Sequence, residues 1–186
     1  MRSFIAIDVP AGIKSSIDGV MRNISAYTQG VRWVPVENIH LTLKFLGDVT
    51  DDLAEEIEKK LSAICWRYQP INIDIKGAGA FPNLRNPSVL WVGICLSERL
   101  AALFSEIDAA LSEMGFVRES RRFSPHLTIG RVKDRRDMDA AVRELSTYKD
   151  TFFGTIEVRE ILLMKSDLKP SGAEYSKLAV IKLISE

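Results

Sequence analysis

The two histidines of the chain both stand in the same short pattern. One motif is His40-Leu41-Thr42-Leu43 and the other is His126-Leu127-Thr128-Ile129. Because residues i and i+2 point to one face of a β-strand, the histidine and the threonine share one face in each motif, and the aliphatic residues share the other. We expect the aliphatic face to turn to the core, which leaves an imidazole and a hydroxyl together on the open face.

This set of side chains suits acid–base chemistry at phosphorus. Opening a 2',3'-cyclic phosphate with water needs a base for the water proton and an acid for the departing ribose oxygen, roughly in line with each other. Histidine, with a reference pKa of about 6.5, can play either part near neutral pH. Hydroxyls can donate to the non-bridging oxygens, where negative charge collects. We therefore predict a catalytic set of His40, His126, Thr42 and Thr128.

Two other interpretations of the histidines compete with this one. A lone histidine more often caps a strand or satisfies a buried hydrogen bond, but equivalent positions of duplicated halves fall close together across a pseudo-two-fold axis. A zinc site usually needs three or four ligands, and these histidines have no nearby cysteines or paired carboxylates. We therefore expect no metal site.

The elements that must position the motifs are expected in the same order in both halves of the chain. Each half has an apolar strand-like run, a helix of 3.6-residue period, the motif and a second helix. His126 follows His40 by 86 residues, and Leu90 follows Phe4 by the same offset. The expected elements are strands at 4–7, 31–34, 40–43 and 71–75 with helices at 13–24 and 51–66, then strands at 90–94, 126–129, 155–158 and 178–181 with helices at 100–111 and 138–145.

Composition limits the function classes. The 186 residues are 46% hydrophobic and 27% charged, as in an ordinary folded protein of one domain or two small lobes. Basic and acidic residues number 25 each, which argues against a protein that coats long nucleic acid but allows a small anionic ligand or the tip of a longer one. Asp8 and Pro10 interrupt the first apolar run, so we expect neither a signal peptide nor a membrane segment. Cys65 and Cys95 are expected to be buried thiols in a reducing cytosol, which indicates a cytoplasmic protein.

Three further segments carry expectations. Residues 77–87 are rich in glycine and proline and are expected to form a long loop between the halves. Trp33, Trp66 and Trp91 stand in apolar contexts and are expected in the core. Residues 118–136 are locally basic, which fits either a solvated surface or a contact with an RNA backbone.

At the two motifs the sequence resembles the two-histidine phosphoesterases, and within them the LigT-like RNA 2',3'-cyclic phosphodiesterases, also called 2'-5' RNA ligases. The family signature is a pair of His-x-Thr/Ser-x motifs with apolar x. Both motifs fit it with their flanks, and the likeness covers essentially the whole chain. The matching segments are Arg2–Ile7, His40–Gly47, Gly79–Asn83 and Pro125–Arg131.

The resemblance implies an α+β fold: a single domain over residues 1–186, with duplicated strand-helix-strand-strand lobes divided near 77–88. Two antiparallel sheets would face each other across a central cleft with helices outside. It implies hydrolysis to a 2'-phosphate without a metal ion or nucleotide cofactor, with weak reverse joining of RNA ends. The substrates would be RNA 3' ends, tRNA fragments among them, and we expect a monomer.

By the same resemblance His40 is the proton donor and His126 the proton acceptor, whereas the residues themselves leave this division open because the motifs are nearly symmetric. Arg131 would contact the phosphate or base, and Phe45 would pack against the nucleobase. Each lies five residues after its histidine, so a bulge or a strand end must intervene to bring it onto the histidine's face, and Gly130 could allow a bulge. The other interpretation of Phe45 is a core residue.

Two other functions stay open at this point. The substrate could be a small cyclic phosphate of the ADP-ribose type, because the sequence does not fix the size of the pocket. The protein could also be an RNA-end binding module without turnover. Intact histidines and threonines in both motifs count against the second alternative.

Overall fold

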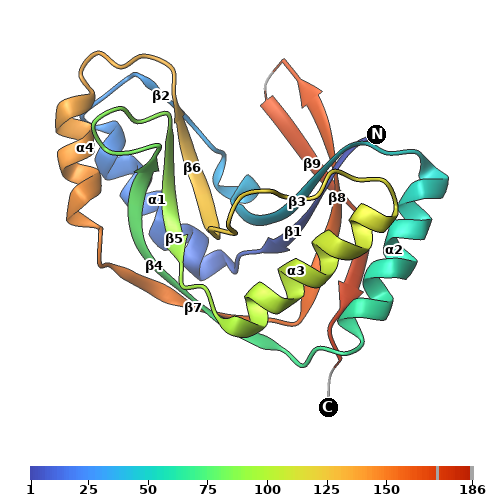
Figure 1. The fold of residues 1–186 in the computed structure, drawn as a ribbon. Helices are drawn as coiled ribbons and strands as arrows, with labels where there is room; N and C mark the ends of the chain where they lie inside the picture. Colours follow the sequence, from blue (N-terminus) through green and yellow to red (C-terminus); the bar gives the residue numbers. More distant parts are fainter. Residues whose placement is uncertain (171, 185–186) are drawn as a thin grey trace.

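The computed structural model describes residues 1–170 and 172–184, and it is an α+β fold, as predicted (Figure 1). Its α-helices are α1 (Ala11–Ser25), α2 (Asp51–Cys65), α3 (Glu98–Glu113) and α4 (Met138–Thr147), with a 3-10 turn at Val36–Asn38. Its strands are β1 (Arg2–Asp8), β2 (Val31–Trp33), β3 (His40–Asp48), β4 (Ile71–Phe81), β5 (Val89–Ile94), β6 (His126–Val132), β7 (Phe152–Val158), β8 (Glu160–Lys169) and β9 (Gly172–Lys182).

The strands form one antiparallel sheet in the order β7-β4-β5-β6-β3-β1-β8-β9, with β2 paired to β6. The motif strands β3 and β6 meet in the middle through the register pair Leu41 and Leu127. We call β3, β1, β8 and β9 the β3 arm, and β6, β5, β4, β7 and β2 the β6 arm; the two diverge from this junction (Figure 1). The expected separation into two sheets is therefore not confirmed, because main-chain pairing at the junction joins the arms.

Each arm draws elements from both halves of the sequence. Strand β4, from the first half, pairs with β5 and β7, whereas β8 and β9, from the end of the chain, complete the sheet beside β1. Helix α1 packs with α4 against the β6 arm, and α2 and α3 lie together beside the β3 arm (Figure 1). The division into lobes near 77–88 stays a prediction.

The helices follow the predicted periodicity. Helix α1 buries its apolar stripe, and α2 does the same below an N-terminal cap in which Thr50 Oγ1 accepts from the Leu53 N–H. Ser97 caps α3 in the same way. The buried apolar positions of α1, α2 and α3 include Ile13, Ile17, Val20, Met21, Ile24, Ile57, Leu61, Ile64, Leu100, Leu103, Ile107 and Leu111.

The long loop expected at 77–87 is wrong in its first part, because β4 continues to Phe81. Gly77 has a φ of +81° and lies at a register shift between Ile75 and Ala78, so it accommodates a bulge rather than ending the strand. Gly79 admits the Trp91 ring, since a Cβ there would lie 2.5 Å from that ring. These glycines serve a bulge and a close contact inside a strand.

Two predictions of burial are also wrong. Trp66 is 71% exposed, because it is the C-terminal cap of α2, one residue beyond the buried face. Cys95 is exposed because it follows the last residue of β5. Cys65 is buried, which raises the pKa of its thiol to about 12. Trp33 packs against the core, and Trp91 is half-buried.

Candidate active site

A bulge in β3 turns Phe45 toward the open face. Lys44 pairs with Ile5 and Thr42 with Ala6, which leaves Leu43 as the extra residue. The alternation of β3 therefore shifts by one position, and the Phe45 side chain lies on the same face as Thr42. Phe45 is 69% exposed, so its interpretation as a core residue is wrong.

Strand β6 has a bulge at the equivalent position. Gly130 pairs with Leu90 and Thr128 with Trp91, so Ile129 is the extra residue and Arg131 comes to the face of Thr128. A Cβ on Gly130 would lie 2.6 Å from Val31 Cγ1 of β2, so a glycine is required by close packing. Of the two alternatives, bulge or strand end, the structure has a bulge in both strands, and in β6 the extra residue is Ile129, next to Gly130.

All six sequence-predicted residues line one cavity of about 670 Å³: His40, Thr42, Phe45, His126, Thr128 and Arg131. A neighbouring cavity of about 380 Å³ shares five of them, the exception being His126. Extending the Leu41–Leu127 register by one residue places His40 beside Thr128 and Thr42 beside His126. Both motifs line the same cavity, so a phosphate bound there can be reached from both sides.

The His40 ring is held on several sides. Its Nδ1 lies 2.7 Å from the Asn38 carbonyl oxygen, and its Nε2 lies 3.0 Å from Thr42 Oγ1. Phe4 stacks on the ring with centroids 4.8 Å apart, and Tyr175 of β9 meets it edge-on at 5.4 Å. These contacts fix the ring plane and leave little rotameric freedom.

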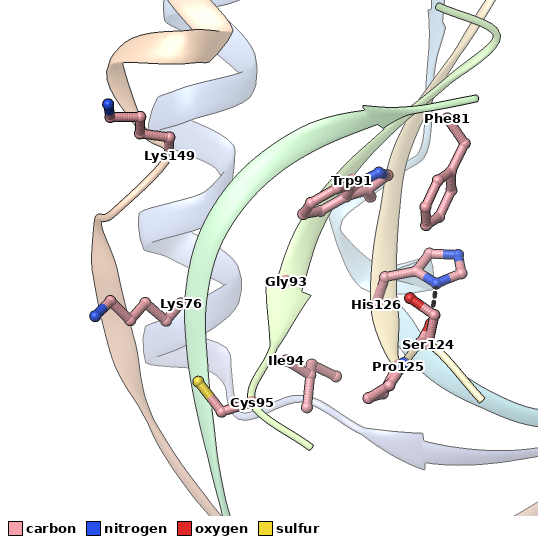
Figure 2. A pocket seen from close by; sticks show the side chains of 10 residues that line it. All are labelled: Lys76, Phe81, Trp91, Gly93, Ile94, Cys95, Ser124, Pro125, His126 and Lys149. Atoms are coloured by element: carbon pink, nitrogen blue, oxygen red, sulfur yellow. Dashed lines mark hydrogen bonds between the residues drawn. The ribbon is translucent and has the colours of Figure 1, made fainter. Parts of the chain in front are cut away.

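The His126 ring is held in a related way. Its Nδ1 lies 2.7 Å from the Ser124 carbonyl oxygen, and Phe81 meets the ring edge-on at 4.9 Å (Figure 2). A third cavity, of about 300 Å³, flanks this histidine; Lys76 and Lys149 lie at its far end, away from the imidazole (Figure 2).

The two carbonyl contacts assign the working nitrogen. When Nδ1–H donates to a carbonyl oxygen, the neutral ring carries its lone pair on Nε2. Both histidines therefore present Nε2 for proton exchange, and in the neutral state the Thr42 hydroxyl donates to Nε2 of His40. Two Nε2 atoms on one cavity can give and take protons at a bound phosphate ester.

Charged side chains lie near the His40 ring. Burial lowers the pKa of His40 below its ordinary value of 6.5; the Asn38 carbonyl opposes this, Lys14 adds to it and Asp8 opposes it. Asp8 pairs with His40 across β1 and β3, and Lys14 Nζ donates to Asp8 Oδ1 at 2.9 Å. Burial raises the pKa of Asp8, but the hydrogen bonds from Lys14 and the Val9 N–H outweigh it, so that pKa lies below 3.8. At the position that corresponds to Asp8, His126 pairs with Gly93.

Sequence reasoning missed several of these neighbours. Asn38 and Ser124 each lie two residues before their histidine, so the duplicated offset could have identified them. Tyr175 could not have been found, because β9 reaches His40 only through the order of strands in the sheet. The register also pairs Val89 with Arg131 as it pairs Phe4 with Phe45, so Val89 corresponds to Phe4, one residue away from the predicted Leu90.

The basic segment 118–136 divides into parts. Arg121 and Arg122 line the cavity of about 670 Å³ with Arg131. Arg118 and Arg136 instead pair with the carboxylates of Asp108 and Asp134. Part of the segment therefore faces the candidate site, and part is an ordinary charged surface.

Among residues 1–170 and 172–184, no group of three or more histidine, cysteine, aspartate or glutamate side chains could hold a metal ion. Over the same residues, no helix has the length and apolar character needed to cross a membrane.

A cavity lined by His-x-Thr motifs on two equivalent strands is the arrangement of a two-histidine phosphoesterase. The chain belongs to the 2'-5' RNA ligase superfamily, which its residues 21–170 match. The RNA 2',3'-cyclic phosphodiesterase of Methanocaldococcus jannaschii is 40% identical over 175 residues, covering 94% of this chain and 96% of that protein. The protein of the same name from Methanothermobacter thermautotrophicus is 34% identical over 183 residues, covering 98% and 99%.

Solved structures agree on the fold. A protein of Thermus thermophilus superposes with a TM-score of 0.83 at 24% identity, over 98% of both chains. Escherichia coli LigT, crystallised in complex with 3'-AMP, superposes with a TM-score of 0.73 at 25% identity, over 99% of this chain and 98% of that one.

Proposed function

We propose that this protein hydrolyses 2',3'-cyclic phosphates at RNA 3' ends to 2'-phosphates, without a metal ion or other cofactor. The observation that carries the proposal is the convergence of both His-x-Thr motifs on one cavity, each imidazole presenting Nε2. The relatives named RNA 2',3'-cyclic phosphodiesterases, which match almost the full chain, support the same activity.

In the proposed reaction Nε2 of His126 takes a proton from water as the water oxygen bonds to phosphorus. The bond from phosphorus to the 3' oxygen breaks in line, and Nε2 of His40 gives that oxygen its proton. The product carries its phosphate on the 2' oxygen. At the end of the reaction His126 is protonated and His40 is neutral. Proton exchange with the solvent restores the starting protonation states.

The remaining site residues bind the phosphate and the nucleoside. Hydroxyls of Thr42 and Thr128 donate to the non-bridging oxygens, and the Arg131 guanidinium pairs with the phosphate charge. Phe45 packs against the nucleobase, because its ring is exposed at the cavity. When Nε2 of His40 is protonated it no longer accepts from Thr42, and that hydroxyl is released to donate to the phosphate.

Several finer points belong to the same proposal. The same site would join a 2',3'-cyclic phosphate end weakly to a 5' hydroxyl: that hydroxyl takes the place of water, the bond from phosphorus to the 3' oxygen breaks, and a 2'-5' linkage forms. We propose that the substrates include tRNA fragments with cyclic ends, and that the protein acts as a monomer in the cytoplasm.

The deciding experiment compares three substrates in the presence of EDTA: a 2',3'-cyclic mononucleotide, a short RNA with a cyclic 3' end, and ADP-ribose cyclic phosphate. We expect turnover of the nucleotide substrates, a 2'-phosphate product, and no loss of rate on chelation. Faster turnover of ADP-ribose cyclic phosphate than of either nucleotide substrate would show that the enzyme acts on this small molecule and not on RNA ends. Tight binding of the RNA end with no turnover would make the protein a binding module.

A further inference from the structure

The catalytic cavity has one wall that the chemistry at phosphorus does not use. This wall is formed by the segment between α3 and β6 and by the facing side of α3, and it lines the same cavity of about 670 Å³ as the two histidines. Its side chains are Phe104, Glu119, Arg121, Arg122 and Phe123. We call these residues the α3 wall.

The α3 wall contains an aromatic platform. Phe104 of α3 and Phe123 stack almost in parallel, with ring centroids 3.9 Å apart and planes 4° apart. Both rings are half-buried at the cavity. A flat aromatic surface beside a phosphate site is a stacking surface for a nucleobase, and such stacking tolerates any base.

Positive charge lies beside the platform. Arg121 and Arg122 are exposed, and among the described residues neither forms an ion pair, whereas Arg118 and Arg136 of the same basic segment do. One carboxylate oxygen of Glu119 accepts a hydrogen bond from the backbone N–H of Arg121 at 2.9 Å. Unpaired guanidinium groups next to an aromatic platform suit the phosphodiester of a single strand.

The α3 wall is anchored from behind. Lys44, which the β3 bulge turns inward, forms an ion pair with Asp108 of α3 and donates to the Val117 carbonyl oxygen at 2.6 Å. Asp108 also accepts from the Glu119 N–H at 3.2 Å. The side chains of Lys44 and Asp108 are only 8% and 6% exposed. This buried ion pair holds the start of the segment between α3 and β6 in place. A preordered wall loses little conformational entropy when a ligand binds.

We propose that the α3 wall binds the nucleotide that precedes the cyclic phosphate in an RNA chain, with its base on Phe123 and its phosphodiester on Arg121 and Arg122. This inference rests on the proposed function and names the substrate class that the site prefers. An RNA end of two or more nucleotides occupies this wall, whereas a cyclic mononucleotide has no second base or phosphodiester to place there.

The test measures kcat/KM for a cyclic-ended trinucleotide and for a 2',3'-cyclic mononucleotide. In Arg121→Ala/Arg122→Ala, we expect the loss on the trinucleotide to exceed the loss on the mononucleotide about tenfold. The slope of log kcat/KM against log salt for the trinucleotide should also become shallower by about 0.7, the contribution of one phosphate contact on a single strand. The matched control is Lys133→Ala/Arg136→Ala, which removes the same charge from the same basic segment outside this cavity.

Phe123→Ala tests the platform, and we expect its loss on the trinucleotide to exceed that on the mononucleotide about tenfold, with most of the preference restored in Phe123→Tyr. Equal losses on both substrates, or an equal effect of the control pair, would overturn the proposed subsite while leaving the phosphodiesterase activity in place. If the unaltered protein turns over neither substrate, the proposed function itself fails.

Discussion

The His40 and His126 motifs share a frame and differ in what surrounds it. In both, a carbonyl two residues upstream binds Nδ1, an aromatic ring meets the imidazole edge-on, and a bulge follows the threonine. The surroundings then diverge. His40 has Asp8 across the strand pair where His126 has Gly93, and Phe45 stands where Arg131 stands in the other motif.

This difference shows how a duplicated frame can serve an asymmetric reaction. The shared features orient two imidazoles, which acid and base both need. The differing features are charged neighbours: Asp8 raises the pKa of His40 against the larger lowering by burial, and Arg131 brings positive charge to the β6 side. Lys44 and Gly130 differ in the same way, since one anchors the α3 wall and the other makes room for β2.

The largest effect is expected where the two motifs are most alike. His40→Ala and His126→Ala should each lower kcat roughly 10²–10⁴-fold, because each removes one member of the acid–base pair. The double variant should be little slower than either single one, because the pair acts as a unit. Single-turnover hydrolysis of a cyclic mononucleotide measures this. Near-normal rates in both single variants would rule out the two-imidazole mechanism.

The next effect concerns Lys44 and the stability of the anchor. Lys44→Met leaves the buried Asp108 carboxylate without its main partner and should lower the free energy of unfolding by about 3–5 kcal/mol. Lys44→Met/Asp108→Asn, which removes both charges, should be less destabilised than the single variant. Urea unfolding monitored by circular dichroism checks this order; a single variant as stable as the original protein would show that the pair is solvated.

The threonines should matter less than the histidines. Thr128→Val removes a hydroxyl donor to the phosphate, for which we expect a loss in kcat of about 10²-fold. Thr42→Val removes a donor that is also bonded to His40 Nε2, so it should change the pH profile as well as the rate. Thr→Ser at either position keeps the hydroxyl and is the matched control. An unchanged pH profile in Thr42→Val would show that this bond does not govern the proton on His40.

The smallest expected effect is a shift of pH dependence. If His40 is the acid, kcat/KM falls as the pH rises through its pKa, which burial lowers. Asp8→Asn removes a charge that raises this pKa, so the basic limb should move to lower pH; Lys14→Met removes a charge that lowers it, so the limb should move to higher pH. Lys177 also faces Asp8 and is unchanged in both variants. Shifts of the acidic limb alone would assign His40 as the base.

Local patterns predicted the site well because its frame is local. The two His-x-Thr motifs, the helix stripes and the need for a bulge before Phe45 and Arg131 all depend on residues close in sequence. The neighbours supplied by strand order could not be predicted, and Tyr175 is the clearest case. Strand β8 was missed because Ile161, Leu162 and Leu163 are consecutive buried residues, which give no alternating pattern.

The exchange of strands between the halves also sets an order of assembly during synthesis. Strands β4 to β7 can complete the β6 arm once residue 158 has been made, but β1 waits for β8, where Met164 pairs with Phe4. At about 5–20 residues per second, the first strand translated keeps one edge unpaired for several seconds or longer. Tyr175 reaches His40 only after that, so a ribosome that stalls before β8 and β9 are made leaves a chain with both histidines, an open sheet edge and a His40 ring without its Tyr175 contact.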